Sequence, residues 1–345
     1  MKKLVDRLAK ENDLTAEELR ALLLCQDIDT MDYLGKTADK VRKQTYGNEV
    51  YIRGLIEFTN ICKNDCYYCG IRKSNEKVSR YRLTEEDILK ACENGYSLGF
   101  RTFVLQGGED PYWDDDKLVH TVKAIRTAYP DCAITLSAGE KTRESYQRLF
   151  DAGADRYLLR HETANGEHYS RLHPDNLSLK NRLECLYNLK EIGYQTGCGF
   201  MVGSPYQTVD NIVEDLKFIK KFQPQMVGIG PFLAAQNTPF ASEPNGSAEL
   251  TIKILSMVRL LIPRVLLPAT TALGTAESDG REKGIMAGAN VVMPNLSPAD
   301  VRKKYMLYDN KIATGDEAAE SVAHLQRSMN KIGYNVVFTR GDYIK

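Results

Sequence analysis

Three absences bound what this chain of 345 residues can do. No segment approaches the roughly 20 consecutive apolar residues that cross a bilayer, and the start, MKKLVDRLAKENDL, lacks the apolar stretch of a signal peptide. The formal net charge is zero, because 46 basic residues balance 46 acidic ones. That balance argues against a broad surface for nucleic acid. We therefore expect a cytoplasmic protein that binds neither membranes nor nucleic acid.

The sequence has a cluster of cysteines with no histidine nearby. Three of the eight cysteines, Cys62, Cys66 and Cys69, lie within the stretch CKNDCYYC, and none of the five histidines is near them in sequence. In a reducing compartment, clustered cysteines indicate metal binding rather than disulfides. Structural zinc and cysteine-ligated clusters usually take four ligands. The spacing leaves two interpretations: zinc with a distant fourth ligand, or a [4Fe–4S] cluster with one iron open to an exogenous ligand.

A long alternation of short apolar runs with amphipathic stretches fills the middle of the chain. The predicted strands are residues 50–59, 102–107, 133–138, 156–161, 196–203, 226–232, 265–271 and 290–294. Four glycines, Gly99, Gly153, Gly193 and Gly288, stand between a predicted helix and the next strand, where a left-handed residue commonly ends a helix. Thr84 followed by Asp87 predicts a capping box at a helix start.

Eight strands alternating with helices predict an α/β fold, a (β/α)8 TIM-type barrel. The first residues, 1–48, read as an N-terminal helical layer, and residues 49–305 as the barrel. Residues 306–345 are expected to form a short C-terminal extension packed on the barrel, with one helix near EAAESVAHLQRSMNKIG. Active sites of such barrels lie at the carboxyl ends of the strands. There this chain has the cysteine loop and several polar residues, namely Gln106, Gly107, Gly108, Glu109, Ser137, Glu140, Arg160, His161, Glu162, Thr270 and Thr271.

The cysteine loop resembles the motif of the radical S-adenosylmethionine (SAM) superfamily. Cys62, Cys66 and Cys69 have its spacing, the aromatic Tyr68 precedes the last cysteine, and the loop follows the first predicted strand. The resemblance implies one [4Fe–4S] cluster on three cysteines and SAM as a second cofactor, whose methionyl group would ligate the open iron. The turn QGGED resembles the superfamily's Gly-Gly-Glu feature at Gly107, Gly108 and Glu109. It would meet the methionyl ammonium, although a plain tight turn would have the same sequence.

Longer stretches resemble one branch of this superfamily, the [FeFe]-hydrogenase maturases called HydE. They are RYLLRHETAN, MVGIGPF and LPATTALGT, within a likeness that extends from about residue 50 to 305. The resemblance implies reductive cleavage of SAM to a 5′-deoxyadenosyl radical, and a role in assembling the hydrogenase diiron cofactor. It further implies a small iron-containing anionic substrate, an electron donor and other maturation factors as partners.

The resemblance also assigns roles to individual residues. Glu162 would hold the ribose of SAM and Arg182 its carboxylate, with Gln106, Ser137 and Glu140 in the same wall. Arg160, Thr270 and Thr271 would form an anion-accepting substrate cavity, with Tyr305 and Asn295 as weaker candidates at its rim. The residues themselves allow other interpretations, since Arg160 and Glu162 could be a structural ion pair and the threonines ordinary strand residues.

Other functions remain open at this stage. Methylornithine synthase and biotin synthase are the related radical enzymes to exclude, and a non-catalytic iron–sulfur scaffold is the alternative from another class. No cysteine follows Cys198, so the second cluster that some HydE proteins carry near the C-terminus is not expected. We expect the five remaining cysteines to be small buried hydrophobic residues, His161 to be an interior histidine, and Asp114–Asp116 to be a solvated helix start.

Overall fold

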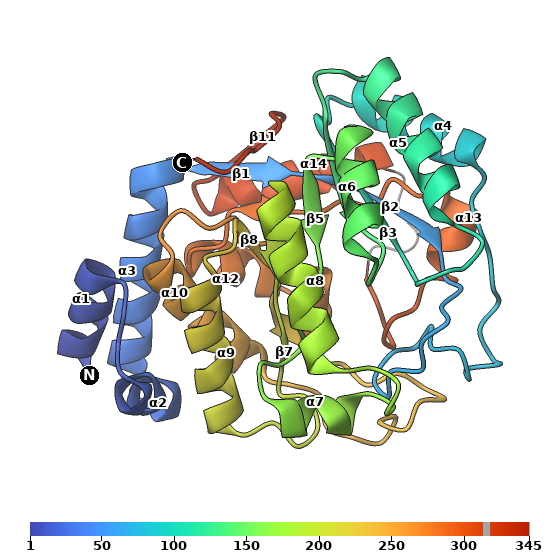
Figure 1. The fold of residues 1–345 in the computed structure, drawn as a ribbon. Coiled ribbons are helices and arrows are strands. Elements are labelled where there is room, and N and C mark those ends of the chain that lie inside the picture. Colours follow the sequence, from blue (N-terminus) through green and yellow to red (C-terminus); the bar gives the residue numbers. More distant parts are fainter. Residues whose placement is uncertain (313–317, 345) are drawn as a thin grey trace.

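The fold was analysed in a computed structural model that describes residues 1–312 and 318–344. The chain begins with three helices, α1 (Lys2–Glu11), α2 (Ala16–Leu24) and α3 (Ile28–Tyr46). As Figure 1 shows, they lie together at one side of the molecule, where α3 packs against α10 (Ala248–Leu261). The helical layer predicted for the first 48 residues is present.

Parallel strands form the centre of the molecule. Six of them pair in the order β2 (Gly54–Thr59), β3 (Thr102–Gly107), β4 (Ala133–Ser137), β5 (Arg156–Leu158), β6 (Gln195–Cys198) and β8 (Met226–Val227). Single parallel bridges continue the ring from Met226 to Leu266 and from Pro268 to Val291. The ring closes where β10 (Val291–Val292) pairs with β1 (Glu49–Ile52) and Asn295 bridges to Leu55. The arrangement is the predicted eight-membered α/β barrel.

Several predicted strands are shorter than their apolar runs. The run 50–59 is divided at Arg53, so that β1 and β2 belong to different sheets. The runs 196–203 and 226–232 are divided where Gly199 and Gly228 approach closely, leaving the short strands β7 (Met201–Val202) and β9 (Gly230–Pro231). In the run 265–271 only Leu266 and Pro268 form bridges. Pro268 has no N–H with which to extend the pairing to β8 beyond Leu266.

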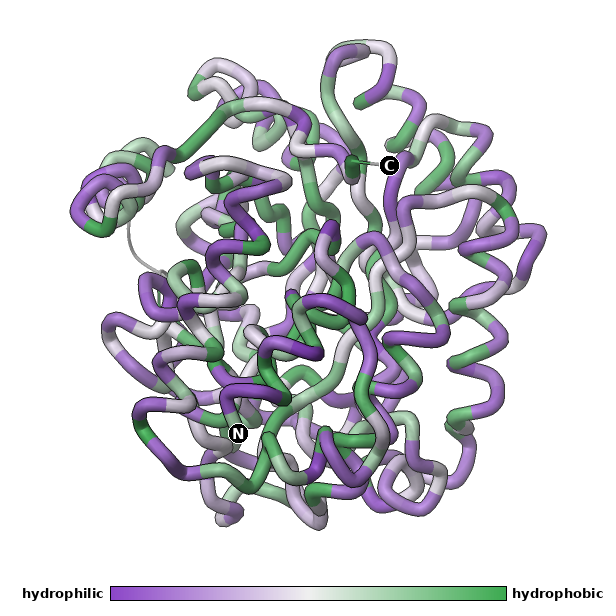
Figure 2. Tube along the Cα trace, turned by 90° about the vertical axis from the view of Figure 1, so that its left-hand side faces the viewer, coloured by the Kyte–Doolittle hydropathy of each residue, from purple (hydrophilic) through white to green (hydrophobic). Residues whose placement is uncertain are grey.

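Helices cover the outside of the barrel. Those that follow the strands are α4 (Glu85–Ser97), α5 (Asp115–Ala128), α6 (Arg143–Asp151), α8 (Leu179–Ile192), α9 (Val209–Phe222), α10 and α12 (Gly280–Met286). Short helices occupy loops: α7 (Gly166–Leu172), α11 (Thr271–Ala276) and α13 (Ala299–Arg302). Figure 2 shows hydrophobic stretches along the inner strands and hydrophilic ones on the peripheral helices and loops. No described helix is both long and apolar enough to cross a membrane.

Local signals in the sequence correctly located helix ends. Thr84 and Asp87 form the predicted capping box of α4. Gly99, Gly153, Gly193 and Gly288 all have positive φ, between 96° and 112°. Asp114 caps α5, and Asp115 and Asp116 lie in its first turn. Each of these features depends on a few neighbouring residues, which is why sequence alone could find them.

The C-terminal extension contains more than the expected helix. Helix α14 (Ala318–Lys331) lies within the predicted stretch, whose first residue, Glu317, is outside the described residues. The chain then adds a strand, β11 (Asn335–Val337), which pairs in parallel with β1. Beyond it, Arg156 donates to the Asp342 carboxylate at 2.6 Å and to the Arg340 carbonyl at 2.7 Å. The last residues therefore cross the amino ends of the strands, and Figure 1 shows the C-terminus beside β1.

Candidate functional site

A cavity of about 280 Å³ opens at the carboxyl ends of the barrel strands. The predicted site residues that line it are Cys62, Cys66, Tyr68, Cys69, Gln106, Gly107, Gly108, Glu109, Ser137, Arg160, Glu162, Arg182 and Tyr305. Those that do not line it are Glu140, His161, Thr270, Thr271 and the weaker rim candidate Asn295. Because these residues come from strands and loops far apart in sequence, the barrel is what gathers them. The cysteine loop thus opens onto the mouth of the barrel, as expected.

The three cysteine thiols share one wall of the cavity. All three are half-buried, and burial raises the pKa of each thiol, to about 12 for Cys69. The backbone N–H of Glu109 donates a hydrogen bond to Cys62 Sγ at 3.4 Å. Among the described residues, no three Cys, His, Asp or Glu side chains converge closely enough to hold a single metal ion. Thiols spread along a wall suit a cluster in which each cysteine binds a different iron, and N–H···S bonds are a known means of tuning such clusters.

The turn after β3 approaches the cysteine loop so closely that only glycine fits. A Cβ on Gly108 would lie 2.3 Å from the carbonyl oxygen of Ile61 and 2.9 Å from Cβ of Cys62. A Cβ on Gly139, which has φ +78°, would lie 2.1 Å from Cγ of Glu109. Gly139 follows β4 and was missed by the sequence analysis, although its SAGE context at a strand end was a usable signal. Gly108 lets the turn pack against the cysteine loop, and Gly139 leaves room for the Glu109 side chain.

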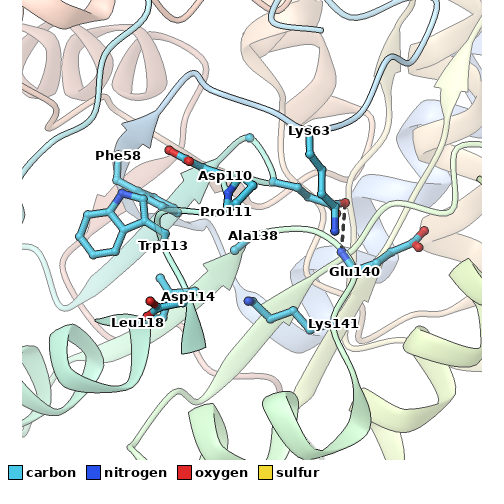
Figure 3. A pocket seen from close by; sticks show the side chains of 12 residues that line it. Phe58, Lys63, Asp110, Pro111, Trp113, Asp114, Leu118, Ala138, Glu140 and Lys141 are labelled. Carbon is cyan, nitrogen blue, oxygen red and sulfur yellow. Dashed lines mark hydrogen bonds and ion pairs between the residues drawn. The ribbon is translucent and has the colours of Figure 1, made fainter. Parts of the chain in front are cut away.

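A second, smaller cavity lies beside the first and shares Gly108 and Glu109 with it. It measures about 170 Å³, and Figure 3 shows its lining, with Lys63 reaching toward the turn that carries Glu140. The Glu109 carboxylate accepts from the Glu140 backbone N–H at 3.1 Å and lies 3.3 Å from the Lys63 ammonium. These two contacts fix the orientation of the Glu109 side chain, which also lines the larger cavity.

Arg182 and Glu140 form a buried ion pair at the cavity wall. Arg182 Nε donates to Glu140 Oε1, and Arg182 Nη1 donates to the Arg160 carbonyl at 2.8 Å. Glu140 also accepts from Asn181, so it lies behind the wall and not in it. One guanidinium nitrogen of Arg182, Nη2, is left for a ligand in the cavity.

Arg160 and Glu162 follow strand β5, and both have polar atoms without a hydrogen-bond partner. Arg160 Nη2 lies 3.1 Å from Glu162 Oε2, yet neither atom has a hydrogen-bond partner of acceptable angle, and Arg160 Nε has none either. Glu162 has φ 65°, a left-handed conformation that costs about 1–3 kcal/mol in a residue other than glycine. Unsatisfied buried polar atoms and backbone strain at one cavity wall are typical of a binding site.

Interior histidines support this wall from behind. His161 is fully buried, accepts from the Gly199 N–H at 3.2 Å, and contacts Asp215 Oδ1 at 3.2 Å. Burial lowers its pKa to about 3, so it stays neutral, and the expectation of an interior histidine is confirmed. His173 accepts from the Tyr68 hydroxyl at 3.2 Å while its other ring nitrogen donates to the Tyr169 carbonyl at 2.9 Å. The Tyr68 ring is thereby held against the cavity, a contact that sequence did not indicate.

The structure does not bring Thr270 and Thr271 into the cavity beside Arg160. The chain leaves its strand early at Pro268 and enters α11, so the Thr270 hydroxyl caps this helix by accepting from Leu273 N–H at 3.3 Å. Thr271 instead accepts from Arg281 Nη2 at 3.3 Å. From this segment Ala272 is the residue that lines the cavity.

The rim also differs from the expectation. Tyr305 lines the cavity, and its hydroxyl accepts from Gln106 Nε2 at 3.3 Å. Asn295 is buried and donates to Glu57 Oε2 at 2.8 Å, so it supports the interior and not the rim. The far wall is largely apolar and comes from residues that no sequence motif indicated, namely Leu158, Leu159, Met201, Pro231, Phe232, Leu233, Leu307 and Tyr308.

The other cysteines lie apart from the cavity. Cys92, Cys132, Cys185 and Cys198 are buried, as expected of small hydrophobic residues. Cys25 is half-buried because it ends helix α2, so the expectation was wrong for this residue.

Comparison with known proteins identifies the family. Residues 56–219 match the Radical SAM superfamily. The [FeFe] hydrogenase maturase subunit HydE of Thermotoga maritima is 44% identical over 324 residues, which span 94% of this chain and 92% of that protein. This chain belongs to the HydE family of radical SAM enzymes.

Other radical SAM enzymes are more distant in sequence. The 3-methylornithine synthase of Methanosarcina acetivorans is 30% identical over 312 residues, 90% of this chain and 87% of that enzyme. The crystal structure of a methylornithine synthase superposes with a TM-score of 0.85 at 28% identity, over 97% of both chains. The HydE relative shares more identity over a longer alignment. Radical SAM enzymes bind a [4Fe–4S] cluster through three cysteines together with SAM, and these are the cofactors of this chain.

Proposed function

We propose that this HydE family member cleaves SAM reductively, through its cluster, to a 5′-deoxyadenosyl radical that acts in assembly of the [FeFe]-hydrogenase diiron cofactor. The observation that carries the proposal is the single cavity that joins the three cysteines, the Gly-Gly-Glu turn and the unsatisfied Arg160 and Glu162. The HydE relative at 44% identity supplies the biological setting. A non-catalytic iron–sulfur scaffold would need the cysteines but neither the turn nor the charged wall.

The residues of the cavity suit the two cofactors. Cys62, Cys66 and Cys69 would hold three irons, since they are the cysteines that line it. The Glu109 carboxylate would accept from the methionyl ammonium and the free Nη2 of Arg182 would donate to the methionyl carboxylate, because opposite charges with hydrogen bonds give the stronger contacts. The unpartnered Oε2 of Glu162 would accept from a ribose hydroxyl. Tyr68, Gln106 and Ser137 would complete this wall.

The substrate would occupy the opposite side of the same cavity. Arg160 carries two nitrogens there without a hydrogen-bond partner, Tyr305 offers a hydroxyl, and the surrounding wall is largely apolar. A cation in an apolar setting favours a small anion, which fits an anionic iron-containing substrate. Thr270 and Thr271 would act indirectly, by fixing α11 so that Ala272 closes the wall. Delivery of the substrate and of electrons would come from other maturation factors and a redox partner.

Replacing Arg182 by Leu should weaken SAM binding by about 1–3 kcal/mol, the cost of losing a hydrogen bond to a charged group. Glu162→Gln should weaken it less, because the amide oxygen still accepts from ribose. Isothermal titration of SAM into anaerobically reconstituted protein measures both affinities. Arg143→Leu, on the exposed surface of α6, is the control. Unchanged affinity in the Arg182 variant would leave that residue a purely structural partner of Glu140.

The test of the proposed function is a paired measurement on Arg160→Leu. We expect this variant to release 5′-deoxyadenosine from SAM at nearly the unmodified rate, since Arg160 lies at the end of β5 and the cluster loop follows β2. It should fail to support activation of apo-hydrogenase co-expressed with the other maturation factors. Arg160→Lys, which keeps the charge, should recover part of that activation.

Two results would contradict the proposal. Full hydrogenase activation by Arg160→Leu would remove its role as the substrate anchor. Failure of the unmodified protein to activate hydrogenase, with SAM cleavage intact, would favour the methylornithine synthase type of reaction, which the TM-score of 0.85 keeps as the second candidate. If a fully loaded cluster produced no 5′-deoxyadenosine, the scaffold alternative would replace both enzymes.

A further inference from the structure

Arg80 binds both ends of the cysteine loop at once. Its Nη1 donates to the carbonyl oxygens of Asn60 at 2.6 Å and Ile71 at 2.8 Å. Its Nη2 donates to the carbonyl oxygens of Arg72 at 2.6 Å and Asn75 at 3.0 Å. The first of these carbonyls comes before the cysteines in the chain and the other three come after them. One planar guanidinium therefore fixes the distance between the chain entering the loop and the chain leaving it.

The charge of Arg80 has no carboxylate beside it. The neighbouring arginines are paired, Arg72 with Asp65 and Arg82 with Asp110 at 2.6 Å, but no ion pair found among the described residues includes Arg80. Its four partners are carbonyl oxygens, which carry only partial charge. A full positive charge thus remains at the base of the loop.

The cysteine loop is the segment that lies next to this charge. The carbonyls that Arg80 binds at Asn60 and Ile71 lie only two residues before Cys62 and two residues after Cys69. The guanidinium is half-buried, so water and salt screen it less than a surface lysine.

We propose that Arg80 is a positioning residue for the cluster, which holds the cysteine loop closed and places a fixed positive charge that makes the cluster easier to reduce. This inference rests on the proposed function, in that Cys62, Cys66 and Cys69 are the cluster ligands. Reduction adds one negative charge to the cluster, so a nearby fixed cation stabilises the reduced form more than the oxidised form. The closed loop also protects the irons from loss, because opening it would break four hydrogen bonds together.

The experiment compares Arg80→Gln, Arg80→Lys and the control Lys73→Gln in anaerobically reconstituted protein without SAM or substrate. Lys73 is exposed in the same loop, and its side chain makes no ion pair in the described structure. The measurements are the midpoint potential of the cluster, from a redox titration followed by electron paramagnetic resonance, and the rate of iron release to a ferrous chelator. Circular dichroism melting verifies that each variant is folded.

We expect the midpoint potential of Arg80→Gln to shift to more negative values, while Arg80→Lys stays close to the unmodified protein and Lys73→Gln does not move. Iron release should be several-fold faster in both Arg80 variants, because neither side chain can span four carbonyls. An unmoved potential in Arg80→Gln, or an equal shift in Lys73→Gln, would overturn the inference. A protein that takes up no cluster in any form would instead refute the proposed function, so the two failures are distinguishable.

Discussion

Changing Cys62, Cys66 or Cys69 to Ala is expected to abolish production of 5′-deoxyadenosine while the barrel stays folded. A cluster held by three thiolates has no spare protein ligand, so loss of one thiol exposes a second iron and destabilises the cluster. The fold should survive because none of the three belongs to the fully buried core and each substitution removes only a sulfur. The measurement is chromatographic detection of 5′-deoxyadenosine after reduction with dithionite, alongside thermal melting of the apoprotein.

Cys25→Ala provides the matched control. Cys25 is also a half-buried cysteine, but it lies at the end of α2, outside the cavity. This variant should retain both the cluster and SAM cleavage. The unmodified protein should bind about four irons per chain, the content of one [4Fe–4S] cluster. Unmodified cleavage in a loop variant would disprove the ligand assignment, and loading near eight irons would reveal a second cluster.

Lys311→Met is expected to lower the free energy of unfolding by about 3–5 kcal/mol at neutral pH, the typical cost of leaving one partner of a buried ion pair alone. Lys311 Nζ contacts Glu57 Oε1, and the two side chains are only 6% and 1% exposed. Glu57 lies on β2 and also accepts a hydrogen bond from Asn295. Urea unfolding followed by circular dichroism measures the loss.

The effect of this substitution should depend on pH. Burial raises the pKa of Glu57, and Lys311 opposes that rise, so removing the lysine raises this pKa further. A carboxyl group whose pKa is higher in the folded state than in the unfolded chain gains protons on folding. The stability lost in Lys311→Met should therefore shrink as the pH falls from neutral toward the ordinary glutamate range, near 4.3.

A double variant isolates the ion pair from the packing. Glu57→Gln combined with Lys311→Met removes both charges and keeps an oxygen for the Asn295 amide. This double variant should be more stable than Lys311→Met alone at neutral pH. Equal stability of Lys311→Met and the unmodified protein would show that the buried pair does not contribute to the stability of the fold.

The most accurate sequence inferences concern features set by a few neighbouring residues. The spacing of Cys62, Cys66 and Cys69 placed them in one loop, and the glycines at helix ends adopted the conformation that only glycine takes easily. The alternation of apolar runs predicted the barrel. Because active sites of such barrels lie at the carboxyl ends of the strands, the barrel in turn predicted where the polar residues meet. The prediction of the site's position was correct because the carboxyl ends of parallel strands lie on the same side of a barrel, whichever side chains they carry.

The errors and omissions concern contacts between distant segments. Pro268 shortened its strand, so Thr270 and Thr271 entered a helix instead of the cavity. Gly139 matters because Glu109, from another strand, lies against it, and Tyr68 is held by His173 from the loop after α7. Neither contact can be predicted from the spacing of residues along the sequence.

By itself, the sequence determined the position of the cysteine loop, the order of strands and helices, and the superfamily, because each depends on residues adjacent in the chain or on a regular period. Only the tertiary structure decided which polar groups face the cavity unsatisfied, as Arg160 and Glu162 do, and which are used up internally, as Glu140 is by Arg182. It also decided that Arg80 closes the cysteine loop through four carbonyl oxygens. Backbone carbonyls are the same at every position of the chain, so their convergence on one guanidinium follows from the folded path alone.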